Sequence, residues 1–558
     1  MKKYIFLFLF AVVPCFVHAQ TETFINRIQE PLSPSEQRYN LITTDIKSTV
    51  QKGLYDNPAF YEMLHQNASL LKGERRKKAA VLSGYANGEL NGDFLPTEGN
   101  KFEDFRVLGT GEYSLDSVGT LFGTVQYSRG KHENIGWNTV RYPDLYLPYI
   151  TTDSIGGNFN YESYMVKGGY AFKLNKIFLG INGHFKGEQA HRKTDPRAVN
   201  NTTWLNVNVG AGYIFNKHVL LLNAGYERNK QHVSLRYWRP GQQDRFWVAY
   251  GFGLYDTKHS TVSFGYSRMY YITGGNAAIS YLSPTDKAVT VNARLAYKYN
   301  HLKTEETDIR DLYFSKTHYF QPVININWNP QTAFSFHLLL SSNTNLRNGH
   351  ENIFEQYKVD EVNNVYDFRL IDTRQNYKKQ ESENLGQLKV SYNITKGHTV
   401  SILGGANLSY KKETYKENNH KISTTAILPH IGAGYQLTAR KSEFDFNTLY
   451  INKQMLSDTY DVNILNTSVK HIDFQHAFTP YAFNNSTFSC ININTTYVYH
   501  FSKMDVGINC KLMFKRGDRD KDAQYLKEIG FNSIAPKIDP LQGKHNETWG
   551  ALALFVVF

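Results

Sequence analysis

The chain has 558 residues, a mildly polar composition and a formal net charge of +12 at pH 7. A soluble protein of this length normally divides into several domains joined by Pro- or Ser-rich linkers. We find no such linker after about residue 80, which argues against a string of soluble domains. The basic residues are interleaved with acidic and amide residues rather than gathered in one patch, which argues against nucleic-acid binding.

The first residues have the three-part layout of a secretory signal peptide. Lys2 and Lys3 precede an apolar run from Tyr4 to Val13, and Ala19 ends a small-residue cleavage site before Gln20. Such a run is too short to span a membrane as a helix. We therefore expect residues 1–19 to be a signal peptide. No apolar stretch of about 18 residues follows Gln20, so no transmembrane helix is expected.

Residues 20–77 form a separate N-terminal segment in this interpretation. Ser33 and Asn57-Pro58 are typical helix starts, which predicts one or two short helices. This mostly helical segment is expected either in the periplasm or inside the lumen as a small plug, and the sequence leaves both alternatives open.

The rest of the chain, residues 78–558, alternates between apolar and polar residues over long segments. From Thr203 to Phe215 the odd positions are mostly apolar, and Asn206 and Asn208 stand between them. A turn at Asn216-Lys217 follows, and the alternation then continues in the next segment. Successive side chains of a strand point to opposite faces, so each segment has one apolar and one polar face.

A soluble β-sandwich also alternates, but three further features favour a membrane barrel. The segments are about ten to fifteen residues long, as a tilted strand needs to cross a bilayer. Aromatic residues gather near strand ends, as the interfacial girdles of barrels require; examples are Tyr213, Phe215, Trp328, Tyr497, Tyr499 and Phe501.

The third feature is that short turns alternate with long polar connections, as in outer-membrane barrels. The sequence predicts tight turns near Ser117, Lys176, Lys217, Lys258, Pro330, Lys396, Lys441 and Lys503. It predicts long loops at Gly130–Tyr161, Gln189–Thr202, Asn345–Asn384, Ser457–Tyr481 and Gly517–Asn546.

These observations predict an all-β fold, a transmembrane antiparallel up-and-down β-barrel of about 16–20 strands in the bacterial outer membrane. Lipid cannot form hydrogen bonds with a strand edge, so the sheet must close on itself. A barrel of this size encloses water or a plug rather than a packed core. Outer-membrane lipid is therefore the first expected partner.

The polar faces of the predicted strands give the residues expected to line the lumen. These candidates are Asn182, His184, Lys186, Asn206, Asn208, Glu227, Lys389, Asn407 and Lys511. The same alternation directs Cys490 toward the lumen and Cys510 toward lipid. Cysteines on opposite faces cannot form a disulfide, so two free thiols are expected.

The last strand resembles the C-terminal strand of outer-membrane barrels, which the barrel-assembly machinery reads. The chain ends in Phe558, and apolar residues alternate before it: Leu552, Leu554 and Val556. The resemblance implies that these four residues are the assembly signal.

The segment Leu54-Tyr55-Asp56-Asn57-Pro58-Ala59 carries a second resemblance. It is similar to the Asn-Pro-Ala segment that precedes the first strand in fatty-acid-transporter-like barrels. The chain as a whole resembles an uncharacterised outer-membrane barrel family of Bacteroidota, known as a domain of unknown function. The alternative for Asn57-Pro58 is an ordinary helix start, with Asn57 as the N-cap.

Three classes of function are compatible with such a barrel. The leading hypothesis is a channel or transport-associated barrel of unknown substrate. The second is a non-enzymatic accessory or scaffold barrel that works with a surface lipoprotein, a secretion system or a TonB-dependent receptor. The chain itself does not resemble such a receptor, because residues 20–77 are too few for the large plug domain of that family.

An outer-membrane enzyme is the third and least favoured class. Neighbouring acidic and histidine residues occur in predicted loops, at His132-Glu133, His350-Glu351, Asp473 and His476. No spacing among them indicates an oriented base beside a nucleophile. We find no metal-ligand spacing and no phosphate-binding loop, so no cofactor, metal or catalytic residue is expected.

Overall fold

A computed structural model of the chain describes most residues from Lys77 onward. The described ranges are 77–92, 94–115, 119–153, 155–238, 246–256, 266–284, 287–306, 311–330, 333–360, 362–363, 365–417, 419–462, 471–472, 474–518 and 544–558. The predicted signal peptide and the N-terminal segment 20–77, apart from Lys77, lie outside these ranges. Within them, no helix is long and apolar enough to cross a membrane.

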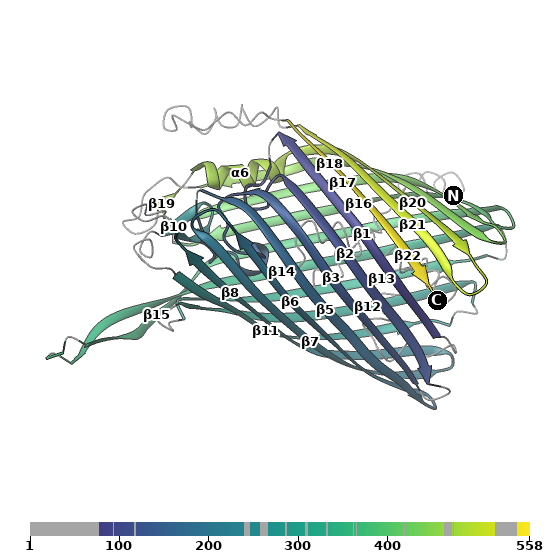
Figure 1. Cartoon of the computed structure of the whole chain (residues 1–558), viewed down its shortest axis with the longest axis horizontal. Helices are drawn as coiled ribbons and strands as arrows, with labels where there is room; N and C mark the ends of the chain where they lie inside the picture. Colours follow the sequence, from purple (N-terminus) through teal and green to yellow (C-terminus); the bar gives the residue numbers. More distant parts are fainter. Residues whose placement is uncertain are drawn as a thin grey trace, which may run out of the picture.

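Eighteen antiparallel strands form one closed barrel (Figure 1). Each wall strand pairs with the next one along the chain, and β1 pairs with β22 to close the cylinder. The wall strands are β1 (Lys77–Gly92), β2 (Lys101–Leu115), β3 (Gly119–Ile135), β5 (Gly157–Leu174), β6 (Ile177–Arg192), β7 (Arg197–Phe215), β8 (His218–Arg236), β11 (Tyr266–Leu282), β12 (Val289–Glu306), β13 (Tyr313–Trp328), β14 (Phe334–Asp360), β15 (Val365–Thr395), β16 (His398–Tyr415), β17 (His420–Thr438), β18 (Ser442–Asp461), β20 (Thr487–His500), β21 (Asp505–Asp518) and β22 (Lys544–Val557).

The all-β, up-and-down barrel and its expected strand number are thus confirmed. The closing pair runs over the last strand from His545 to Val557, with Tyr85 opposite Leu552 near the middle of the register. Closure gives every wall strand two neighbours, so no strand edge is left without backbone partners in the bilayer.

Outward and inward side chains alternate along the wall as the sequence predicts. On β7, Leu205 and Val209 are 41% and 52% exposed, whereas Trp204 and Asn206, on either side of Leu205, are 2% and 4% exposed. Large apolar side chains therefore point outward on most strands, as a hydrocarbon environment requires. A barrel with this outer surface belongs in an outer membrane.

One end of the barrel carries the tight turns and both ends of the described chain. The turn between β7 and β8 has positive φ at Asn216 and Lys217, the geometry of a two-residue hairpin turn. Tyr213 and Trp328 face outward near this end, as girdle residues do. Short turns mark the periplasmic end of such barrels, so the opposite end, here named the loop end, faces outside.

Two of the predicted long loops are wrong. Residues 189–202 are mostly strand, because β6 and β7 are joined by a short turn after Arg192. Residues 345–384 are also mostly strand: β14 and β15 continue past the barrel rim as a paired hairpin that projects into solvent (Figure 1). Polar strands outside the bilayer lose the one-sided pattern, which is why their sequence resembles that of a loop.

The tight turn expected near Lys258 lies outside the described residues. The strands before it, β9 (Trp247–Gly251) and β10 (Leu254–Asp256), pair with each other and not with the wall. Together with β4 (Thr151–Thr152) and β19 (His471–Ile472), they form a second, four-stranded sheet.

The two cysteines are free, as expected. Cys490 is buried on the inner face of β20, and Cys510 lies on the outward face of β21, between the inward residues Asn509 and Lys511. In the register of these strands Cys490 is opposite Lys515 and Cys510 is opposite Thr495.

Candidate functional site

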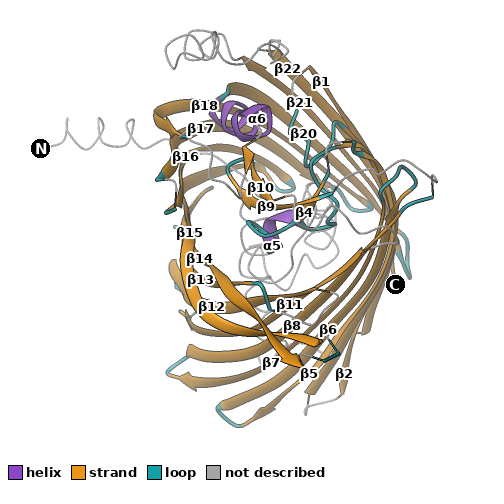
Figure 2. Ribbon diagram, turned by 90° about the vertical axis from the view of Figure 1, so that its left-hand side faces the viewer, coloured by secondary structure: helices purple, strands orange, loops and turns teal. Residues whose placement is uncertain are grey.

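The candidate site is the lumen at the loop end, where two connections fold back into the barrel (Figure 2). The first is residues 136–156 between β3 and β5, which includes the short helix α5 (Pro143–Tyr146). The second is residues 246–256 between β8 and β11. Thr151 and Thr152 pair with Val248 and Trp247, so the two connections form one unit. We call this unit the loop plug.

Aromatic rings form the core of the loop plug. Tyr146 of α5 packs on Tyr270 of the wall strand β11, with ring centroids 4.6 Å apart. Tyr149 stacks on Tyr313 of β13 at 4.8 Å, and Tyr250 meets the same ring edge-on. Tyr146 and Tyr149 are fully buried. Such packing fixes the plug against the wall by ordinary aromatic burial.

A row of polar contacts holds residues 136–156 to five different wall strands. The Arg141 side chain and the Tyr142 hydroxyl both donate to Glu188 of β6, at 2.7 and 2.6 Å. Lys186, one inward position away on β6, donates to the Tyr142 hydroxyl at 2.8 Å. Asn200 of β7 donates to the carbonyl of Thr139 at 3.0 Å.

Further round the wall, one side chain and three main-chain carbonyls of the plug make the contacts. The Tyr146 hydroxyl donates to Asn229 of β8 at 2.5 Å. Arg347 of β14 donates to the carbonyls of Asp144 and Leu147, both at 2.8 Å. Arg268 of β11 donates to the carbonyl of Tyr149 at 3.3 Å.

At its C-terminal side the first connection is held by a buried ion pair. Arg192 of β6 donates to Asp153 at 2.7 Å, and both side chains are completely buried. Breaking such a pair by removing one partner leaves an unpaired buried charge and costs about 3–5 kcal/mol. An apolar contact would hold the connection to the wall as well, so the charged pairs contribute a defined position more than net stability.

The second connection reaches the other side of the wall. The Tyr250 and Tyr313 hydroxyls are hydrogen-bonded at 2.7 Å. Phe252 stacks on His420 of β17, with centroids 5.9 Å apart. Burial raises the pKa of Tyr250 well above its ordinary value, because the charged phenolate would lose its hydration.

The predicted lumen residues of β6, β7 and β8 all face inward. The Asn208 amide donates to Asn182 at 3.1 Å and to Asn206 at 2.6 Å, and it accepts from Asn276 of β11 at 3.2 Å. Glu227 forms a buried ion pair with Lys298 of β12 at 2.5 Å. The four asparagines are thus joined in one hydrogen-bonded group on the inner wall, and the Glu227–Lys298 pair belongs to the same polar layer of inward residues.

The remaining predicted lumen residues are placed as follows. His184 and Lys186 are 6% exposed on the inner face of β6. Asn407 and Lys511 are likewise buried on β16 and β21, and Lys389 on β15 is half-buried. Lys389, Asn407 and Lys511 lie on β15, β16 and β21, whereas the asparagine layer lies on β6, β7 and β11.

Apart from Lys186, the residues that hold the loop plug are not among those predicted from the sequence. Arg268 and Arg347 are inward residues of predicted or extended strands, so the period-two pattern could have identified them. Arg141 and Asp153 lie in a connection without periodicity, and only the fold brings them to β6. No signal in the sequence predicts that contact.

The acidic and histidine neighbours noted in the sequence do not form dyads. His132 points inward on β3, whereas Glu133 points outward and pairs with Lys131 at 2.8 Å. Glu351 accepts from the buried Tyr415 hydroxyl at 2.6 Å, and His350 stacks on Phe314 instead. Asp473 and the His476 side chain lie outside the described residues. Among described residues no His, Cys, Asp or Glu cluster is arranged to hold a metal ion.

The closed eighteen-stranded sheet and its apolar outer surface define the protein as an outer-membrane β-barrel. The chain belongs to a family of unknown function, DUF6850, whose model matches residues 68–554. No curated protein is similar to the chain at a significant level.

Several solved structures are similar in fold at low identity. One is the ferric preacinetobactin receptor from Acinetobacter baumannii, 9% identical over 87% of this chain and 80% of that chain, with a TM-score of 0.40. Another is the FrpB iron transporter from Neisseria meningitidis, 9% identical over 88% and 82%, with a TM-score of 0.38. A third is the ferric yersiniabactin uptake receptor from Yersinia pestis, 9% identical over 87% and 81%, with a TM-score of 0.34.

Proposed function

We propose that this protein is a transport-associated outer-membrane barrel whose passage is closed at the loop end by the loop plug. The observation that carries the proposal is that a hydrogen-bonded unit is built into the lumen of a wide barrel with a polar inner wall. A wall of eighteen strands is too wide for its own side chains to fill. The closure is made by residues 136–156 and 246–256. A barrel that served only as a scaffold would not need such a closure.

The polar contacts of the plug support a closure that can open. Buried ion pairs such as Arg192–Asp153 add little net stability compared with apolar packing, but they specify one arrangement. The polar layer of Asn182, Asn206, Asn208 and Glu227 would line the path beneath the plug. The substrate is a polar solute in this proposal, since the inner wall presents amide and charged groups to it. Residues 20–77 remain the second element proposed to act in the periplasm or as a plug.

The test is the conductance of the refolded barrel in a planar bilayer. Ile135 and Gly157 are already paired, so a short Gly-Ser turn can replace residues 136–156 without stretching the wall. A matched control removes residues 353–372, a similar number, from the projecting hairpin, where Asn352 and Thr373 are paired. Both deletions are made with and without residues 20–76.

We expect the plug deletion to conduct several-fold better than the full chain and the hairpin deletion to conduct like the full chain. Folding of each variant is checked by the change of gel mobility on boiling. A folded barrel that lacks both residues 20–76 and residues 136–156 and still does not conduct would exclude a transport role.

The projecting hairpin favours a second candidate function, an accessory barrel that binds a surface lipoprotein or receptor. Beyond the barrel rim the hairpin exposes large apolar side chains, among them Val362 at 88% and Ile371 at 56%. Exposed apolar side chains on a projecting element are typical of protein-binding surfaces. Cross-linking in intact cells tests this role: loss of a cross-linked partner in the 353–372 deletion supports it, and a full chain that cross-links to nothing contradicts it.

The C-terminal strand agrees in geometry with the proposed assembly signal. Leu552, Leu554 and Phe558 point outward, at 48%, 58% and 60% exposure, and Val556 is half-exposed. We propose that the assembly machinery reads this outward row, because it is accessible before the barrel inserts.

A further inference from the structure

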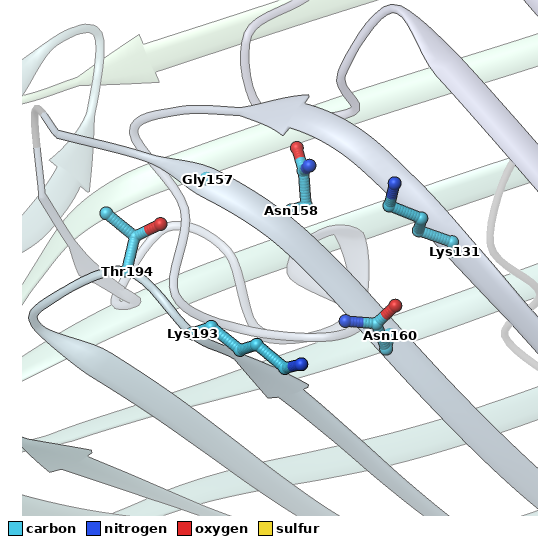
Figure 3. Close-up of a pocket in the computed structure, with 6 residues that line it drawn as sticks. All are labelled: Lys131, Gly157, Asn158, Asn160, Lys193 and Thr194. Atoms are coloured by element: carbon cyan, nitrogen blue, oxygen red, sulfur yellow. The ribbon is translucent and has the colours of Figure 1, made fainter.

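A cavity opens on the outer surface of the barrel near the loop end (Figure 3). Its volume is about 470 Å³, and its lining residues are Lys131, Gly157, Asn158, Asn160, Lys193 and Thr194. They come from β3, from the start of β5 and from the turn between β6 and β7. The cavity is separate from the lumen, because the inward residues of these strands are Ser128, His132, Phe159 and Tyr161.

The wall geometry fixes the lining residues. Lys131 and Asn160 are directly opposite each other in the β3–β5 register. Asn158 is oriented by a hydrogen bond from the backbone N–H of Asn134 to its side-chain oxygen, at 3.0 Å. Lys193 extends toward Asn160 (Figure 3).

The turn that carries Lys193 is held from inside the barrel. Arg192 donates to the carbonyl of Pro196 at 2.7 Å and to Asp153 of the loop plug. At Gly157 a Cβ atom would lie 2.8 Å from the Thr194 hydroxyl, so only glycine allows this close approach of β5 to the turn. The cavity is therefore a built feature of the wall rather than a gap between mobile side chains.

The chemistry of the cavity is that of an anion site. Two ammonium groups and two side-chain amides supply hydrogen-bond donors, and no carboxylate is among the lining residues. Glu133 takes one donor of Lys131 at 2.8 Å, which leaves the other two. Lys193 has no ion pair with any residue that the structure describes. Phosphate, with three or four acceptor oxygens, suits such a set of donors.

The position relative to the membrane indicates where the anion comes from. Tyr127 lies four residues before Lys131, and Tyr164 lies four residues after Asn160. The two tyrosine rings pack together on the outer surface, with their centroids 5.2 Å apart. Val125 and Val166 are the next outward residues on the same strands, in the direction of the bilayer, and their side chains are 57% and 56% exposed. Outward tyrosines next to an apolar band mark the membrane interface. The cavity therefore lies roughly 13 Å further along the strands than the tyrosines, on the outer side, where lipid head groups begin.

We infer that this cavity binds the phosphorylated head group of a lipid of the outer leaflet, with Lys131 and Lys193 as the charged contacts. The inference is independent of the transport proposal, since it concerns the outer surface. The cavity lies next to the Arg192–Asp153 pair. Arg192 bonds both to the turn that carries Lys193 and to the loop plug, so the lipid site and the plug share this residue.

The test uses the full chain purified in mild detergent, with lipid binding measured by native mass spectrometry. The probes are bisphosphorylated lipid A, the same lipid without phosphates, and inorganic phosphate as competitor. The variant is Lys131→Gln with Lys193→Gln. The matched control is Lys230→Gln with Lys303→Gln, which removes two outward lysines of β8 and β12 that do not line the cavity.

We expect the cavity variant to bind bisphosphorylated lipid A about thirtyfold more weakly, because a lysine near an anionic lipid surface contributes about 1 kcal/mol. The control variant should bind like the unmodified chain, and the lipid without phosphates should bind the unmodified chain weakly. Equal binding of both lipids to the unmodified chain would overturn the inference even if the variant failed to fold. If millimolar inorganic phosphate displaced the lipid, the inference that the ligand is a lipid head group would be rejected, and free phosphate would be the ligand.

Discussion

At the scale of single residues, the position of the loop plug depends on charged side chains that reach it from the wall. Glu188 is the centre of one such group, because its two oxygens accept from Arg141 and Tyr142. Lys186 lies 3.4 Å from the same carboxylate. A neutral side chain at this position would leave two buried cations without a counter-charge.

We predict that Glu188→Gln loosens the plug by about 3–5 kcal/mol, the usual cost of removing one member of a buried pair. Hydrogen exchange of the backbone amides in residues 139–151 should accelerate by about two powers of ten or more, since 1.4 kcal/mol corresponds to a factor of ten. The matched control is Glu162→Gln. Glu162 is half-exposed and lies 3.9 Å from Arg129 on the outer face, so this change should cost less than about 1 kcal/mol. Similar exchange rates in the two variants would contradict the assigned role of Glu188.

At the scale of elements, the wall strands could be predicted from the sequence and the plug could not. Period two determines which face of a strand meets lipid, so positions such as Asn206 and Val209 follow from their neighbours alone. The plug has no comparable pattern, because its contacts are far apart along the chain: Arg347 binds the carbonyl of Leu147 across 200 residues. The projecting hairpin was mistaken for a loop because solvent on both faces removes the apolar half of the pattern.

We predict that the loop plug opens at alkaline pH, because two of its buried tyrosines would then ionise. Burial raises the pKa of Tyr149 and Tyr250 well above the ordinary value of 10.0, and neighbouring Glu351 and Tyr313 add to the effect. A raised pKa in the folded plug means that its stability is fully present below pH 10 and is lost as the pH rises beyond that value. The conductance of the full chain should therefore be low at pH 7 and increase above about pH 10.

The control for this pH dependence is Tyr149→Phe with Tyr250→Phe, which removes the two ionisable groups and keeps the rings. Its conductance should begin to rise at a higher pH than that of the unmodified chain. A conductance that stays constant up to pH 11.5 in the unmodified chain, while its gel mobility still changes on boiling, would contradict the prediction.

At the scale of the whole molecule, the outer surface and the closed backbone depend on each other. The sheet closes because lipid offers no partner to a strand edge, and the outward side chains are apolar because lipid surrounds the closed sheet. Leu222 on β8 is 56% exposed and lies between the outward aromatic residues Phe215 and Tyr226, so it faces the middle of the apolar band. Gln189 on β6 is also outward but lies near the loop end.

An arginine introduced at Leu222 should therefore destabilise the folded barrel more than an arginine introduced at Gln189. Leu222→Arg should lower the free energy of unfolding in lipid vesicles by about 2–4 kcal/mol, and Gln189→Arg by about 0–1 kcal/mol, because the cost of arginine falls from the bilayer centre to its interface. Urea titration of refolding, followed by the change of gel mobility on boiling, measures both values. In a soluble β-protein an exposed leucine replaced by arginine would cost almost nothing at either position. Equal and small effects of the two substitutions would therefore mean that the alternating apolar residues do not face hydrocarbon, and the placement of the barrel in a membrane would be wrong.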